Sequence, residues 1–268
     1  MLTSLNSAVS GLDAFQQEMD IIGNNIANIN TTGFKSGNGN LVDSFSNTLQ
    51  AATIGGTSSS DSMQIGTGVT TASITNDWSQ GTINSTGVSS DLAINGNGFF
   101  VVQDPTTTNQ YVTQDGTFSV NSKGNLVTST GMYVLGTGGT PIVLAPAAGL
   151  SMVGYSVGAT GAITVTNSDG STTASGQITL QNFQNPGALV SAGGNLYSNM
   201  ANAGPLTAAV NPGQSGTGTI QSGALELSNV DLSAEMAALI TAQRGFEANS
   251  KIVTTSDEIL QDVVQMKR

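Results

Sequence analysis

The stretch MLTSLNSAVSGLDAFQQEMDIIGNNI, residues 1–26, has an apolar side chain at alternating steps of four and three residues. A mean spacing of 3.5 residues is typical of a helix whose apolar seam faces another helix. The alternative interpretation is an ordinary amphipathic helix that faces a protein core. The seam positions are Met1, Leu5, Ala8, Leu12, Phe15, Met19, Ile22 and Ile26.

The other end of the chain carries a weaker form of the same pattern. Halfway between its apolar positions Met236 is apolar, whereas Gln243, Ser250 and Asp257 are polar. Because a half-polar seam makes a weak isolated dimer, we expect this helix to pack among several helices in an assembly. The positions that recur every seven residues are Leu232, Leu239, Phe246, Val253 and Leu260.

The middle of the chain has a different character. All 6 prolines lie there, and proline is excluded from helix interiors. Short runs of Val, Ile, Thr and aromatic residues alternate with turn dipeptides, most clearly Asp115-Gly116, Lys123-Gly124 and Asp169-Gly170. This alternation predicts antiparallel β-hairpins.

Together these patterns predict an α+β fold, in which helices at the two ends flank a Gly-rich antiparallel β domain. An isolated helix at either end would be marginal in water, because ordering the backbone costs about 1 to 2 kcal/mol per residue. We therefore expect the ends to be loose in the monomer and to order on assembly. The expected segments are an N-terminal assembly helix over 1–30 that pairs with a C-terminal one over 225–268, an extended connector over 31–75, and a β-rich domain over 76–224.

Amides crowd the end of the first helix, in NNIANINTTGFK at residues 24–35. Asn24 and Asn28 are four residues apart and share a helical face, and Asn25 lies beside them. One interpretation is local: the polar side chains satisfy the last backbone groups, Gly33 adopts the left-handed turn and Phe34 anchors the exit. The other is that some of these amides contact neighbouring subunits. Both interpretations remain open at this point.

The amino-acid composition excludes several classes of partner. The 268 residues carry 6 basic and 17 acidic side chains, a net charge of −11, so nucleic acid and anionic membranes would be repelled. No apolar run reaches the roughly 18 to 20 residues that span a bilayer, and we expect no membrane insertion. Lys35 is the first basic residue, so the chain lacks the basic flank of a cleaved signal peptide. Either it stays inside the cell, or it leaves without such a signal.

The sequence predicts no catalytic residue, no cofactor and no metal site. GYSVG at residues 154–158 matches the hydrolase pattern around Ser156, but with 0 histidines the base of the triad is missing. GNG at residues 96–98 lacks the third glycine of a dinucleotide loop. Asp104 and Asp115 could be neighbours after folding, although a turn or cap role is the simpler interpretation. The absence of cysteine excludes a thiolate metal site.

Three stretches together resemble the bacterial flagellar axial proteins, the rod and hook family. They are NNIANINTTGFK, DLAINGNGFFVV at residues 91–102, and GALELSNVDLSAEMAALITAQRGFEANSKIVTTSDEILQ at residues 223–261. The resemblance implies subunits stacked helically into a hollow tube, with the terminal helices inside and the β domains as its wall. It also implies delivery by the flagellar type III export apparatus, and as partners other copies of the chain, adjoining axial proteins and the hook cap. The place would be the hook or basal body of the flagellum, exported beyond the cytoplasm.

Within that family the amino-acid sequences of the motifs resemble those of hook proteins more than those of distal rod proteins. The length of the chain favours a rod protein. The segment from Gly136 to Ala192 is too short to contain the extra outer domain of many hook proteins. A short hook subunit that transmits torque is the first choice, and a distal rod subunit is the alternative. A β adhesin or tail-fibre-like binding module would explain the middle of the chain but not its two helical ends. An enzyme is disfavoured by the missing histidine and cysteine.

Overall fold

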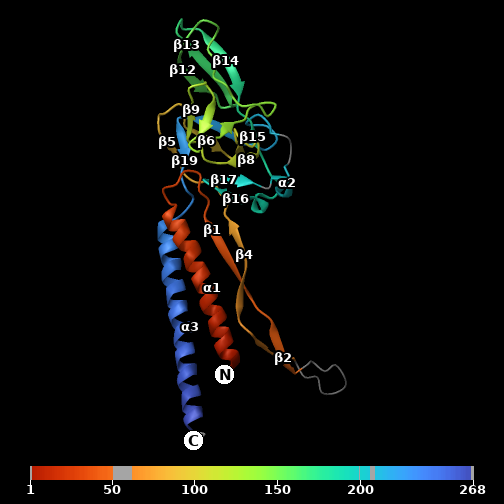
Figure 1. Ribbon diagram of the computed structural model, residues 1–268, viewed down its shortest axis with the longest axis vertical. Coiled ribbons are helices and arrows are strands. Elements are labelled where there is room, and N and C mark those ends of the chain that lie inside the picture. Colours follow the sequence, from red (N-terminus) through yellow and green to blue (C-terminus); the bar gives the residue numbers. More distant parts are fainter. Residues whose placement is uncertain (1, 51–61, 199, 206–208, 267–268) are drawn as a thin grey trace. The chain divides into compact units, whose positions relative to one another are not determined.

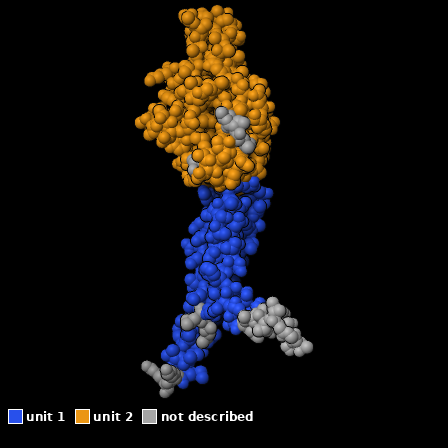
Figure 2. All heavy atoms as spheres, turned by 90° about the vertical axis from the view of Figure 1, so that its right-hand side faces the viewer, with its two compact units in different colours: residues 1–27, 37–77, 231–268 blue, residues 28–36, 78–230 orange. Residues whose placement is uncertain are grey.

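The computed structural model describes residues 2–50, 62–198, 200–205 and 209–266. Met1 of the predicted seam and residues 51–61 of the predicted connector lie outside the described residues. The chain divides into two compact units (Figure 2). Unit 1 contains residues 1–27, 37–77 and 231–268, and unit 2 contains residues 28–36 and 78–230. Helices at both ends and antiparallel strands between them confirm the predicted α+β class (Figure 1).

Unit 1 consists of two long helices and a β ribbon. The helices α1 (Leu2–Ala27) and α3 (Leu232–Met266) lie side by side, and the ribbon runs along α1 (Figure 1). The ribbon strands are β1 (Gly37–Asp43), β2 (Ser46–Gln50), β3 (Met63–Gly66) and β4 (Val69–Asn76). In it β1 pairs with β4 and β2 with β3, both antiparallel.

The ribbon occupies most of the segment expected as an extended connector over 31–75. Extended strands must pair their backbone N–H and C=O groups, and here the segment pairs with itself. Ser10 of α1 holds the ribbon, since its Oγ accepts a hydrogen bond from the Val69 amide at 3.2 Å. Gly39 lies so close to Ile21 that a Cβ there would be 3.0 Å from the Ile21 Cδ1 atom.

The helix expected over 225–268 begins later, at Leu232, because Asp231 caps it. The Asp231 carboxylate accepts a hydrogen bond from the Ser233 amide at 2.8 Å, and its carbonyl accepts one from Glu235 at 3.0 Å. Aspartate is among the preferred N-cap residues, since it satisfies the first free amides of a helix.

Unit 2 is almost entirely antiparallel β structure. Its largest sheet has eight strands in the order β16-β17-β8-β7-β11-β10-β9, with β15 also paired to β7. These strands are β7 (Phe99–Gln103), β8 (Gln110–Thr113), β9 (Phe118–Val120), β10 (Leu126–Thr128), β11 (Tyr133–Val134), β15 (Leu180–Gln181), β16 (Val190–Gly193) and β17 (Leu196–Ser198).

The remaining elements of unit 2 complete its sheets. A three-stranded meander pairs β12-β13-β14, β6 pairs with β18, and β5 pairs with β19. They are β5 (Ile83–Ser85), β6 (Leu92–Asn95), β12 (Met152–Val157), β13 (Ala162–Asn167), β14 (Thr172–Gln177), β18 (Thr219–Ser222), β19 (Ala224–Glu226), the 3-10 helix η1 (Pro186–Ala188) and the short helix α2 (Met200–Ala203).

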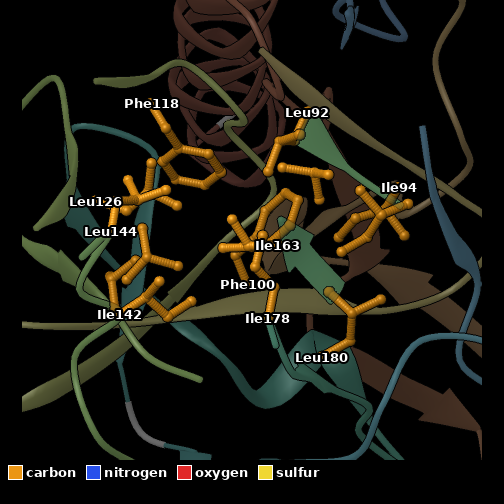
Figure 3. Packing of buried hydrophobic residues seen from close by; sticks show 14 of the residues in the cluster. Leu92, Ile94, Phe100, Phe118, Leu126, Ile142, Leu144, Ile163, Ile178 and Leu180 are labelled. Atoms are coloured by element: carbon orange, nitrogen blue, oxygen red, sulfur yellow. The ribbon is translucent and has the colours of Figure 1, made fainter. Parts of the chain in front are cut away.

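The hydrophobic core of unit 2 gathers side chains from most of these strands. Phe100 of β7 is fully buried and packs edge-on against Phe118, with ring centroids 5.0 Å apart (Figure 3). A second cluster on the opposite face of β7 contains Phe99 and Phe183, with Trp78 packed against them. Alternate residues of one strand thus serve two cores, which explains why β7 is apolar from Phe99 to Val102.

Two of the three predicted turn glycines adopt the left-handed conformation that tight hairpins need. Gly124 and Gly170 have φ of 81° and 82°. Gly116 is required for a different reason, since a Cβ at this position would collide with the Leu92 carbonyl oxygen.

Candidate functional site: the paired termini

The predicted seam of α1 is sheltered from solvent along its described length. Ala8 and Ile22 are buried, at 3% and 5% exposure, and α1 packs against α3. The other described seam residues, which are half-buried, are Leu5, Leu12, Phe15, Met19 and Ile26. The 3.5-residue spacing therefore identified the side of α1 that is covered.

Only part of the seam predicted for α3 is covered in the structure. Leu239, Phe246, Val253 and Leu260 are half-buried, but Leu232 and Met236 are 45% and 44% exposed. The alternate seam positions lie one residue earlier than expected, at Glu235, Ala242, Asn249 and Ser256. Three of these residues are polar and only Ala242 is apolar, so an apolar pattern could not reveal this row. Met236 belongs instead to the exposed face of the helix.

Two glycines let the helices approach closely. A Cβ on Gly245 of α3 would lie 2.5 Å from Cζ of the Phe15 ring on α1. Conversely, a Cβ on Gly11 of α1 would lie 2.5 Å from Nδ2 of Asn249 on α3. Each helix thus presents a glycine to a larger side chain of the other, and this reciprocal fit fixes the register of the pair.

Asn25 connects three parts of unit 1. Its side chain is 2% exposed, and its Nδ2 donates to the Gly37 carbonyl at 2.9 Å and to Glu235 Oε1 at 3.0 Å. Its Oδ1 accepts a hydrogen bond from the Gly37 amide at 2.9 Å. One amide therefore joins α1, the first residue of β1 and α3. The charge-assisted bond to a carboxylate is the stronger kind of hydrogen bond.

The other amides at the end of α1 have different surroundings. Asn24 is exposed, whereas Asn28 is half-buried and accepts hydrogen bonds from Thr31, at 3.0 Å to its carbonyl and 3.1 Å to its Oδ1. Gly33 has φ of 67° and is buried, and Phe34 is half-buried. The turn predicted at Gly33 is therefore confirmed.

Lys35 forms a buried ion pair that the sequence did not indicate. Its Nζ lies 2.7 Å from Glu226 Oε1, with side-chain exposures of 1% and 3%, and it also donates to the Ser79 carbonyl at 2.8 Å. The Gly81 amide donates to the same carboxylate oxygen at 2.9 Å. The backbone adds a further bond, from the Gly33 amide to the Glu226 carbonyl at 2.9 Å.

This polar cluster joins three segments of unit 2 that are far apart in sequence, around residues 33–36, 79–82 and 226–229. The Ser36 amide donates to Asn229 Oδ1 at 2.8 Å, and the Leu227 amide donates to the Thr82 carbonyl at 2.9 Å. A lone basic residue among apolar and hydroxyl neighbours gives no sequence signal for burial. The sequence feature that could have singled out Lys35 is the scarcity of basic residues, since Lys35 and Lys123 are the only ones before Arg244.

The motifs that resemble catalytic sites have structural roles. Ser156 lies in strand β12, and its hydroxyl bonds to Thr164 of the adjacent strand at 2.7 Å. Gly96 and Gly98, with φ of 113° and 143°, form the turn between β6 and β7.

The two aspartates serve separate turns. The backbone amide of Thr106 and the hydroxyl of Thr107 hold the pKa of Asp104 below its usual value. Asp115 accepts hydrogen bonds from Thr32 and Thr117. In the described part of the chain, no group of three or more His, Cys, Asp and Glu residues could hold a metal ion. The helices of that part include none that is long and apolar enough to cross a membrane.

Three family models match successive parts of the chain. Residues 5–35 match "Flagella basal body rod protein", residues 93–165 match "Flagellar hook protein FlgE/F/G D1 domain", and residues 221–266 match "Flagellar basal body rod FlgEFG protein C-terminal". Each of the three sequence motifs falls wholly or largely within one of these regions. The matches thus define a class of flagellar structural protein.

Curated relatives are similar over the whole chain. The flagellar basal-body rod protein FlgG of Bacillus subtilis is 43% identical, with 100% of both chains covered, and that of Borreliella burgdorferi is 35% identical over 100% of both. The chain therefore belongs to the family of flagellar basal-body rod and hook proteins. The flagellar hook protein FlgE of Helicobacter mustelae is 44% identical, but over only 51% of this chain and 31% of the hook protein.

Proposed function

We propose that this chain is a structural subunit of the flagellar basal body that polymerises helically into the distal part of the rod. The observation that carries the proposal is coverage: the rod proteins match from end to end, whereas the hook protein matches half of this chain and a third of its own length. This corrects the first choice made from sequence, a short hook subunit. The hook protein is also similar to part of this chain, so the share of each chain that is covered distinguishes the two interpretations, whereas the motifs alone did not.

The paired termini are the proposed assembly element. The seam holds α1 and α3 together, while the outer face of α3 stays open to solvent, with Ile240 59%, Ile252 43% and Ile259 50% exposed. The ribbon likewise exposes Phe45 at 87% and Ile74 at 61%. Apolar side chains gathered on two elements of one unit favour burial against further subunits. Asn25 is removed from the proposed contact residues, because its hydrogen bonds lie within the chain.

Other copies of the chain and adjoining axial proteins are the proposed partners, and a type III export apparatus is the proposed route of delivery. Both follow from the family. The hook cap was a partner of the hook interpretation and is not part of this proposal. A structural role without catalysis agrees with the structural roles of Ser156, Asp104 and Asp115.

Deleting the gene tests the rod against the hook. If the chain forms the distal rod, basal bodies isolated from the deletion strain should carry a shortened rod and no hook, and the gene supplied in trans should restore both. Full-length rods that lack only the hook would overturn the proposal in favour of a hook subunit. A motile strain with a complete axial structure would overturn both.

A further inference from the structure

An exposed face of α1 carries two carboxylates. Asp13 and Asp20 are seven residues apart, which places them on one side of the helix, about 10 Å apart along its axis. The ion pairs among the described residues include neither of them. We call the exposed residues of this face, which recur at steps of three and four, the acidic row. They are Asn6, Val9, Asp13, Gln16 and Asp20.

The outer face of α3 carries a row of opposite charge. Arg244 and Lys251 are exposed and likewise seven residues apart, and the exposed residues between and beside them are small, so another helix can approach closely. Arg244 bonds to Glu247 at 2.8 Å, but this pair is weak because its side chains are 76% and 64% exposed. A guanidinium has five N–H donors, so Arg244 can bind a second carboxylate. The residues of this basic row are Ala237, Thr241, Arg244, Ala248, Lys251 and Thr255.

Cations that could meet the carboxylates of the acidic row are scarce. The helix α1 itself has no basic residue. Lys35 is buried against Glu226, Lys123 lies in a turn of unit 2, and the last two residues of the chain lie outside the described residues. Arg244 and Lys251 are therefore the described cations that share one helical face. Because the net charge of −11 makes copies repel one another on average, contacts that join opposite charges are favoured.

The directions of the helices restrict how the two rows can meet. Within the chain α1 and α3 run in opposite directions, since Gly11 lies beside Asn249 and Phe15 beside Gly245 (Figure 1). In a polymer of equally oriented copies, α1 of one copy and α3 of its neighbour are then antiparallel as well.

A third position distinguishes the antiparallel alignment of the charges from the parallel one. Glu258 continues the basic row by a further seven residues and is exposed. When the charges of antiparallel helices are aligned, Glu258 lies opposite Asn6, whose amide can donate a hydrogen bond to it. In the parallel alignment Glu258 would lie opposite Ala27, which has no donor on its side chain. The antiparallel alignment therefore satisfies all three charged residues of α3.

We propose that the acidic row of one copy binds the basic row of a second copy, with the helices antiparallel, Arg244 facing Asp20 and Lys251 facing Asp13. This pairing rests on the proposed function, because it assigns the faces through which subunits of that polymer meet. Exposed ion pairs add little affinity, but they fix the register, since other alignments leave charges unmatched or place like charges together.

Charge reversal in a strain that lacks its own copy of the gene tests the proposal. Asp13→Lys with Asp20→Lys sets like charges opposite each other, and we expect about tenfold fewer isolated basal bodies with a distal rod, or a larger loss. Adding Arg244→Glu and Lys251→Glu to the same chain should restore the rods, because the charges are then exchanged. Normal rod numbers from the first variant, or no recovery in the second, overturn the pairing.

Two controls separate the possible causes. Asp104→Lys with Asp169→Lys changes the net charge equally, on exposed turns of unit 2, and should leave rod numbers unchanged. An equal loss in this control would show that net charge is the cause and would overturn the pairing. If the unaltered chain restores rods and the reversed chain does so equally well, the pairing fails while the proposed function stands. If the unaltered chain restores no rod, both fail.

Cross-linking of cysteine variants tests the register independently. The chain has 0 cysteines, so two can be introduced without competing thiols. In isolated basal bodies a short bismaleimide should join chains that carry Asp20→Cys and Arg244→Cys into multimers on a denaturing gel. The matched pair, Asp20→Cys and Lys251→Cys, also removes one acid and one base but lies about two helical turns out of register, and should give few multimers. Equal yields from both pairs, or none from the first, overturn the proposal.

Discussion

The Phe15 ring of α1 occupies the space into which any side chain at Gly245 of α3 would project, with Cζ 2.5 Å and Cε1 2.7 Å from the position of a Cβ. The contact is possible only while residue 245 remains glycine, and it places the two ends of the chain in one register. A substitution at Gly245 should therefore change the stability of the helix pair.

Gly245→Ala should loosen the helix pair. Alanine raises intrinsic helix propensity by about 1 kcal/mol over glycine, but forcing a methyl group against an aromatic ring costs typically 1 to 3 kcal/mol. We expect lower thermal stability of the helical signal in circular dichroism of the polymerised chain, in which both helices are ordered. The control is Gly23→Ala on α1, where a Cβ meets nothing within 4 Å and the propensity gain should appear alone. Equal stabilisation by both substitutions would show that the seam is not tightly packed there.

Asn25→Ala should destabilise unit 1 by about 1 to 3 kcal/mol for the backbone groups of Gly37 that lose their partner. Asn24→Ala, at the adjacent exposed position, should lower the unfolding free energy by less than Asn25→Ala, because groups at an exposed position can exchange a lost partner for water. Proteolysis of the ribbon, followed by mass spectrometry, measures the difference locally. Similar cleavage rates in the two variants would contradict the role assigned to Asn25.

Lys35→Met should destabilise unit 2 strongly, by about 3 to 5 kcal/mol, because it leaves a buried carboxylate without its cation. The double variant Lys35→Met, Glu226→Gln should recover a large part of this loss, since glutamine can still accept the Gly81 amide. Fluorescence of the single tryptophan, Trp78, reports the unfolding of this unit. A double variant no more stable than the single one would show that charge compensation is not the cause.

The association of α1 with α3 should be weak in a single chain outside an assembly. Its seam on α3 alternates apolar residues with Glu235, Ala242, Asn249 and Ser256, so it buries less apolar surface than a regular coiled coil. We therefore expect low helix content in the dilute monomer and a rise on polymerisation. Circular dichroism of the full chain and of a chain without residues 1–27 and 231–268 measures it. If deletion removes the full helical signal of both helices from the dilute monomer, the ends are already ordered and the expectation is wrong.

The sequence predicted those parts of the fold that depend on regular apolar spacing. The seam of α1 was found because every seam position carries an apolar side chain. On α3 only the positions from Leu239 to Leu260 were found, since Glu235 and Asn249 have no apolar signal although they face α1. The cap at Asp231 shortened the helix, and a segment expected as a connector pairs with itself as a ribbon.

Interactions between distant polar residues could not be predicted. Lys35 and Glu226 are 191 residues apart, and the apolar residues beside them, such as Phe34 and Leu225, do not indicate that the two charged side chains pair. Asn25 looked like Asn24 and Asn28, and only the packing of α3 and β1 separates their roles. The three motifs identified the family correctly, and they could not separate rod from hook because its members share them.

The location of the chain in the flagellum tests the central claim most directly. An epitope inserted at Gly170, the hairpin turn between β13 and β14 where a Cβ would meet nothing within 4 Å, leaves both helices intact. In a strain whose motility the tagged chain restores, gold-labelled antibody should mark the straight distal rod of isolated basal bodies in electron micrographs. Label along the curved hook, with none on the rod, would contradict the account.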